Sequence, residues 1–130
     1  MSNPFLSAFN NQINEFMNDI LLLFPNDIDI VNAKNSISLM KKMNPSIIIK
    51  SWYQYIYLPY NENILNEGIE FIINKDYTAD IQAMDDSNKI LDVIDRIKKP
   101  ISKCSTENKD KCLQYIINLN KLSFAYSNKN

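Results

Sequence analysis

Residues 44–58 read NPSIIIKSWYQYIYL, and this stretch decides the fold. Asn44-Pro45 is typical of a helix start, because asparagine caps free N–H groups and proline fits the first helical position. In the helix that this predicts, about residues 45–58, apolar and aromatic side chains cover nearly the whole circumference. The remaining polar strip consists of Ser46, Lys50, Ser51 and Gln54. A helix that is apolar nearly all round is buried, so we predict a central helix with the others packed about it.

The N-terminal flank of this stretch predicts two amphipathic helices. Apolar side chains recur at helical steps after Pro4, and Phe24-Pro25 ends that run because the residue before a proline is disfavoured in a helix. The predicted buried stripe of this first helix consists of Phe5, Phe9, Ile13, Phe16, Ile20 and Leu23. A second helix follows, capped within Asn26-Asp27, and ends with Lys41-Lys42, where cations interact favourably with the helix dipole. Its predicted buried face consists of Ile30, Ala33, Ile37 and Met40.

The C-terminal flank is less regular. Residues 61–75 fit a helix interrupted at Gly68, although residues 69–74 also fit a short strand. A further helix is expected from near Asp86 or Ser87 to the residue before Pro100, and a last helix from Ser105-Thr106-Glu107 onward. The chain has 130 residues, of which 45% are hydrophobic, so it suffices for one domain with its own core. We predict an all-α, single-domain bundle of about five to seven helices over residues 1–126, and a frayed tail over residues 127–130.

Composition argues against common catalytic arrangements. The chain has no histidine, the usual group for proton transfer near neutral pH and the commonest metal ligand. Its single glycine cannot build a phosphate-binding loop, and its single arginine is Arg96. The carboxylate pairs Asp27/Asp29 and Asp92/Asp95 have no nucleophile beside them in the sequence. We therefore predict a protein that is not an enzyme and has no cofactor, metal or small-molecule substrate.

Cys104 and Cys112 are the two cysteines of the chain. A disulfide between them is geometrically possible if the connector folds back on the last helix, but in a reducing compartment we expect two free thiols. One hypothesis for function, which ranks third after the two given below, is a small hydrolase or redox protein that uses one of these thiols. Because there is no histidine, a lysine-rich pocket or a helix N-terminus would have to lower the pKa of the thiol.

Charge is segregated along the chain. Residues 41–60 carry three lysines and no acid, whereas residues 61–87 carry seven acids and one lysine. Such blocks suit contacts between complementary protein surfaces, and the apolar surplus of the central helix favours self-association. We therefore expect a protein partner or a second copy in a homodimer. We expect neither a signal peptide nor a membrane span, since the longest apolar run near the N-terminus, residues 20–25, is too short.

The alternative function is nucleic-acid binding. The segment from Lys41 to Tyr60 combines lysines with Trp52 and four tyrosines, and rings interleaved with lysines suit single-stranded nucleic acid. The competing interpretation is a core helix, because these rings occupy every side of it. The candidate contacts for nucleic acid or a partner are Lys41, Lys42, Lys50, Lys98, Lys99 and Lys103.

Several segments together resemble a known family. They are Phe24-Pro25-Asn26-Asp27, Met40-Lys41-Lys42-Met43-Asn44-Pro45 leading into Ile47-Ile48-Ile49-Lys50, Trp52 to Tyr60, and Ile73-Asn74-Lys75-Asp76-Tyr77. Over roughly residues 5–80 the pattern resembles small helical proteins of giant viruses of the nucleocytoplasmic large DNA virus group, including mimivirus-like and marseillevirus-like viruses. The resemblance implies a viral protein in the host cytoplasm or nucleus, or in the virion, and implies no activity. We therefore expect a non-enzymatic viral protein that acts through protein–protein contacts, either packaged in the virion or modulating the host.

Overall fold

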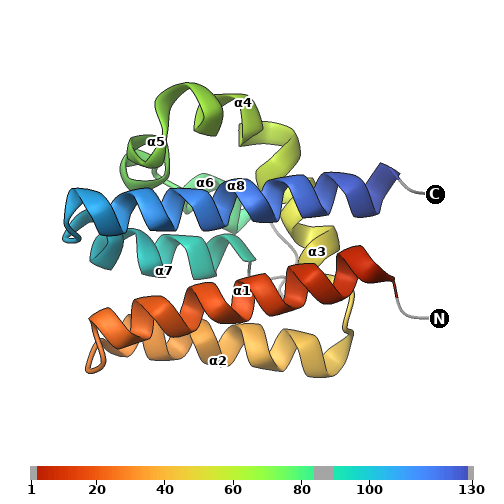
Figure 1. Ribbon diagram of the computed structural model, residues 1–130, viewed down its shortest axis with the longest axis horizontal. Helices are drawn as coiled ribbons and strands as arrows, with labels where there is room; N and C mark the ends of the chain where they lie inside the picture. Colours follow the sequence, from red (N-terminus) through yellow and green to blue (C-terminus); the bar gives the residue numbers. More distant parts are fainter. Residues whose placement is uncertain (1–2, 84–89, 129–130) are drawn as a thin grey trace.

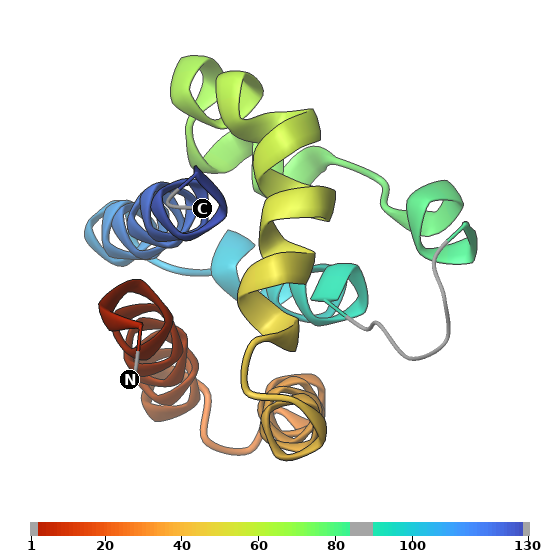
Figure 2. The ribbon, with the colours of Figure 1, turned by 90° about the vertical axis from the view of Figure 1, so that its right-hand side faces the viewer.

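A computed structural model describes residues 3–83 and 90–128, and every regular element in these two ranges is helical. Four helices run roughly along the long axis of the molecule (Figure 1): α1 (Pro4–Leu23), α2 (Ile28–Met43), α7 (Ile90–Ser102) and α8 (Thr106–Asn128). A continuous helical segment crosses their ends (Figure 2): α3 (Ile47–Trp52), η1 (Tyr53–Tyr57) and α4 (Leu58–Glu67). Two short helices lead to α7: α5 (Ile69–Asn74) and α6 (Thr78–Gln82). The predicted all-α, single-domain bundle is confirmed.

Side-chain caps start the first two helices; the cap of the second is the one that the sequence predicts. Asn3 Oδ1 accepts the N–H of Phe5 at 2.8 Å, directly before the first turn of α1. Phe24-Pro25 ends α1, and Asp27 Oδ1 accepts the N–H of Asp29 at 2.9 Å at the start of α2. The predicted buried faces of both helices are confirmed for Phe9, Ile13, Phe16, Ile20, Ile30, Ala33, Ile37 and Met40.

The central helix differs from the prediction in its bounds and its regularity. It begins at Ile47 rather than Pro45, because Ser46 lies in a turn and its N–H donates to Asn44 Oδ1 at 3.0 Å. It also continues past Leu58 to Glu67, and its middle part, η1, is a π-helix. Its predicted central position is confirmed, since α3 packs against α1, α2, α7 and α8.

The π-helical turn accommodates a four-residue period in the core-facing side chains. These are Ile48, Trp52, Ile56, Tyr60 and Ile64. In an ideal α-helix, each four-residue step rotates the side chain by about 40° past a full turn, so the column would leave the core face. A π turn contains more residues per turn and takes up this drift. Tyr60 is half-buried, and the other members of the column are at most 2% exposed.

The C-terminal part corrects three expectations. Residues 69–74 form helix α5, so the strand alternative is wrong. Helix α7 includes Pro100, which the sequence predicts to lie beyond it. Pro100 lies in the last turn of the helix, where it removes one backbone hydrogen bond, and its ring is buried in the core. Helix α8 continues through Asn128, so the predicted frayed tail begins too early.

The expected helix start near Asp86 or Ser87 lies outside the described residues. The start of the last helix is confirmed. Ser105 lies directly before α8, and its Oγ accepts the N–H of Asn108 in the first turn of the helix at 3.2 Å.

A buried polar link joins the central helix to α8. Trp52 Nε1 donates to Asn120 Oδ1 at 2.7 Å, and Asn120 Nδ2 donates to Asn61 Oδ1 at 3.0 Å. Trp52 and Asn120 are 1% and 2% exposed. These bonds satisfy polar groups that would otherwise be buried without a partner, and they fix α8 against both α3 and α4.

Candidate functional site

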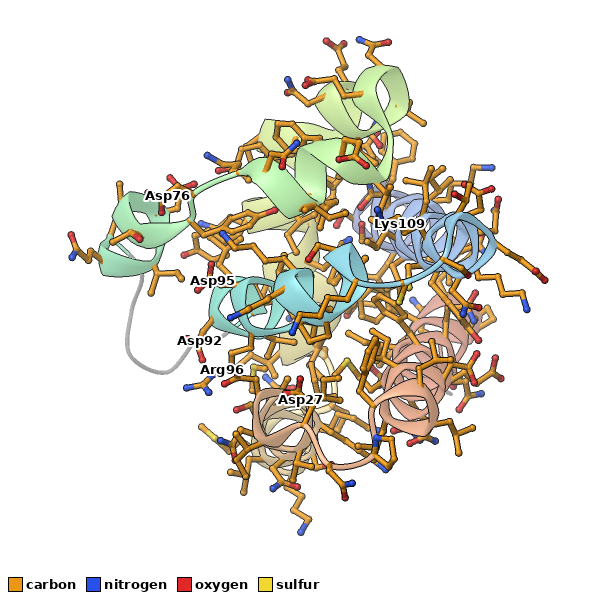
Figure 3. All side chains as sticks on the ribbon, turned by 90° about the vertical axis from the view of Figure 1, so that its left-hand side faces the viewer. Asp27, Asp76, Asp92, Asp95, Arg96 and Lys109 are labelled. Atoms are coloured by element: carbon orange, nitrogen blue, oxygen red, sulfur yellow. The ribbon has the colours of Figure 1, made fainter. Side chains whose placement is uncertain are left out.

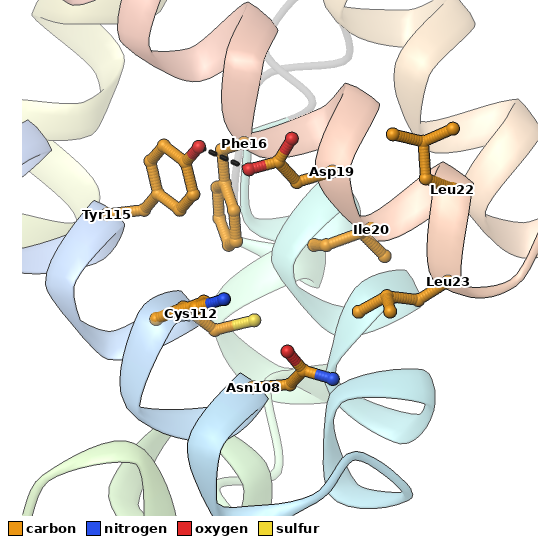
Figure 4. Close-up of a pocket in the computed structure, with 9 residues that line it drawn as sticks. Phe16, Asp19, Ile20, Leu22, Leu23, Asn108, Cys112 and Tyr115 are labelled. Atoms are coloured by element: carbon orange, nitrogen blue, oxygen red, sulfur yellow. Dashed lines mark hydrogen bonds between the residues drawn. The ribbon is translucent and has the colours of Figure 1, made fainter.

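A pocket of about 280 Å³ opens between the C-terminal half of α1 and the N-terminal half of α8 (Figure 4). The buried side chains of Phe16, Ile20 and Cys112, each at most 4% exposed, form an apolar floor. The complete lining consists of Phe16, Asp19, Ile20, Leu22, Leu23, Asn108, Lys111, Cys112 and Tyr115.

Two leucines stand at the rim of this pocket. Leu22 is 79% exposed and Leu23 is 44% exposed, although the sequence places Leu23 on the buried stripe of the first helix. Leu23 is the last residue of α1, and the buried residues of this helix end at Ile20, one turn earlier. Single exposed leucines are ordinary on protein surfaces. Two of them beside an apolar hollow form a place where another apolar side chain can be buried.

Polar groups surround the apolar floor. The Tyr115 hydroxyl donates a hydrogen bond to Asp19, and the Tyr115 ring stacks on Phe16 with 5.1 Å between ring centroids. The hydrogen bond to the Asp19 carboxylate, followed by burial, raises the pKa of Tyr115 to about 12. On the α8 side, Lys111 pairs with Glu107 at 3.8 Å. The pocket therefore has an apolar centre, one anionic group and one cationic group at its edge.

The thiol in the pocket is not activated. Both cysteines are free, as predicted. Burial raises the pKa of Cys112 to about 12, and burial also raises the pKa of Cys104. Both groups are therefore protonated near neutral pH, and a protonated thiol is neither a good nucleophile nor a metal ligand. The apolar floor and the polar rim suit this pocket for binding.

The carboxylate pairs singled out in the sequence hold the fold together. Asp27 caps α2, while Asp29 and Asp92 both contact Arg96, at 3.5 Å and 2.9 Å (Figure 3 labels Asp27, Asp92 and Arg96). Asp95 pairs with Lys98 at 3.1 Å. Neither pair lines the pocket described above.

The six candidate lysines fall into two groups at opposite ends of the molecule. Lys41, Lys42 and Lys50 lie where α2 leads into α3, whereas the other three lie at the end of α7 (Figure 1). In the second group, Lys98 is already engaged: its Nζ donates to Lys75 O at 2.7 Å and lies 5.2 Å from the centroid of the Tyr77 ring. The exposed lysines are Lys42, Lys50, Lys99 and Lys103.

The pocket residues escaped the sequence analysis for a physical reason. Periodicity along one helix shows which face is buried, but it does not show that α1 and α8 diverge at one end. One signal was present: Leu21-Leu22-Leu23 places leucines on adjacent positions, so they cannot all lie on one helical face.

Comparison of the chain with protein-family models, curated proteins and solved structures finds no match. The resemblance to giant-virus proteins therefore stays a prediction. Within the described ranges, no helix combines the length and the apolarity that a membrane span requires.

Proposed function

We propose that this chain is a non-enzymatic binding protein that holds a protein partner at the pocket between α1 and α8. The observation that carries the proposal is the exposure of Leu22 and Leu23 at the rim of an apolar hollow. Protein interfaces have this anatomy, with an apolar centre that accepts an anchoring side chain and a polar rim. The volume of about 280 Å³ suits one such anchoring side chain.

The setting that goes with this proposal is a viral one. The resemblance implies a protein of the host cytoplasm or nucleus, or of the virion, and the proposed partner is then a host or virion protein. A second copy of the chain is the alternative protein occupant, and the expected homodimer would then form through this pocket and not through the apolar surplus of the central helix.

The test is quantitative affinity capture from cells that naturally make the protein, with three tagged forms: wild type, Leu22→Asp and Leu39→Asp. Both leucines are exposed, 79% and 62%, so neither change should affect folding by more than about 0.5 kcal/mol. Leu39 does not line the pocket and is a matched control.

Partners held at the pocket should fall at least about tenfold with Leu22→Asp and persist with Leu39→Asp, as expected for a loss of about 1.4 kcal/mol or more. Equal recovery with all three forms would overturn the proposal. Sedimentation of the purified forms identifies a second copy as the occupant if only Leu22→Asp abolishes concentration-dependent dimers.

A further inference from the structure

A second surface lies at the other end of the molecule, where the start of α1, the α3–η1 segment and the end of α8 meet (Figure 2). The chain segments that reach this end contain no Asp or Glu over residues 3–14, 41–61 and 116–128. The first acids beyond them on α1 and α4 are Glu15 and Glu62. The protein has a net charge of −1, whereas the charged side chains of these three segments are all lysines. Glu62, just beyond the second segment, lines a hollow together with Tyr57 and is the acid next to this surface among the described residues.

Three aromatic rings form a stack across this end. Tyr53 and Tyr57 lie with their centroids 5.4 Å apart and their planes at 11°, and Tyr57 lies 5.3 Å from Phe124 of α8 with the two planes tilted by 39°, so the first pair is parallel and the second is inclined. Phe124 is 45% exposed and both tyrosines are half-buried, so parts of the terminal rings are accessible. The neighbouring Trp52 is 1% exposed and cannot take part, which corrects its assignment to a binding platform.

A lysine accompanies each terminal ring of the stack. Lys50 is three residues before Tyr53, and Lys121 is three residues before Phe124, so each lysine lies on the same side of its helix as the ring. Both lysines are exposed, and neither forms an ion pair with any residue in the described ranges. Lys121 and Phe124 were absent from the sequence prediction, because only the fold brings α8 beside η1.

We propose that this end binds single-stranded nucleic acid, with bases continuing the stack at Tyr53 and Phe124 and with Lys50 and Lys121 contacting the flanking phosphates. Stacking platforms combined with cations are the general way in which proteins hold single strands. A protein partner with a merely acidic surface would use the lysines but would not need exposed rings at both ends of a stack. Since stacking tolerates every base, and Arg96 lies on α7 away from this end, little sequence preference is expected. This proposal is independent of the pocket at the other end.

The test is fluorescence anisotropy with a fluorescein-labelled oligothymidylate of about 12 nucleotides, over a range of salt concentrations. The charge variant is Lys50→Gln/Lys121→Gln. Its matched control is Lys99→Gln/Lys103→Gln, which removes the same charge from exposed lysines at the end of α7. The charge variant should reduce the slope of log affinity against log salt by about 1.4, because each phosphate contact contributes about 0.7. The control should leave the slope unchanged and the affinity within about twofold.

The ring variants are Tyr53→Ala and Phe124→Leu, the second of which keeps an apolar side chain in place. Each should weaken binding by about 5- to 100-fold, as expected for the loss of one stacked base. Circular dichroism of each variant confirms that it is folded. The proposal is overturned if the wild type shows no binding at the lowest salt, if the control weakens binding as much as the charge variant does, or if duplex DNA binds as tightly as the single strand. It is also overturned if the ring variants abolish capture of a protein and leave oligothymidylate binding unchanged.

Discussion

Replacing Asn120 by alanine tests how the central helix is held against α8. Trp52 Nε1 can only donate, so the atom of Asn120 at 2.7 Å is its oxygen, and its NH₂ group must then point toward Asn61. Alanine leaves the buried indole N–H without an acceptor, which costs about 1–3 kcal/mol. The lost bond to half-buried Asn61 adds about 0.5–1 kcal/mol, because water can replace it only in part. We therefore expect Asn120→Ala to lower the free energy of unfolding by about 1.5–4 kcal/mol.

The assay is urea denaturation followed by circular dichroism, within a double-mutant cycle with Trp52→Phe. Phenylalanine removes the N–H donor, so in that background Asn120→Ala should cost only the bond to Asn61. The coupling energy between the two positions should then be about 1–3 kcal/mol. A coupling below about 0.5 kcal/mol would show that the indole N–H does not depend on Asn120, and would refute the reasoning. Asn61→Ala is the comparison variant: it leaves the buried Asn120 NH₂ group without its acceptor, so it should cost about 1–3 kcal/mol, but it leaves the bond between Trp52 and Asn120 in place.

Three further predictions concern single residues. Gly68 has φ 71° and ψ −153°, a conformation that is strained for any side chain, so Gly68→Ala should lower the free energy of unfolding by about 1–3 kcal/mol in urea denaturation; an unchanged midpoint would contradict this. Iodoacetamide should label Cys104 in the folded protein and Cys112 only after unfolding, because Cys112 is 4% exposed and has its pKa raised to about 12; mass spectrometry showing equal labelling of the folded protein would contradict this. The pKa of Tyr115 is raised from 10.0 to about 12, so the contribution of this group to stability is complete below pH 10 and is lost as the pH rises toward 12. Tyr115→Phe should therefore flatten the fall of the unfolding free energy at alkaline pH. An unaltered pH profile would contradict this.

The parts of the fold that local chemistry decides could be predicted from the sequence. Asp27 caps α2 and the proline after Phe24 ends α1, because both effects depend only on neighbouring residues. The buried faces of α1 and α2 follow from helical periodicity in the same way. The prediction for Pro100 was wrong because the expectation that proline ends a helix applies to the helix interior. Pro100 lies in the last turn, and its ring is buried with other apolar side chains of α7.

Neither proposed site could be predicted in full, because each joins two helices that are distant in the chain. Leu22 becomes part of a pocket only because α8 passes beside it, and Tyr57 becomes part of a stack only because Phe124 lies against it. For the candidate lysines, the fold instead separates residues that the sequence analysis had grouped together. Lys50 and Lys99 look equivalent in composition, but the fold separates them to opposite ends of the molecule (Figure 1).

The π-helical turn connects the core to the ring stack. Ile56 and Ile64 remain on the core face because η1 removes the drift of about 40° that each four-residue step has in an α-helix. Tyr53 and Tyr57 are also four residues apart and both belong to η1, so the same turn sets where these two rings leave the backbone. Relaxing the π turn to an α-helix would therefore rotate Ile64 away from the core and Tyr57 away from Phe124 at once. The core packing of this segment and the ring stack therefore depend on the same π turn.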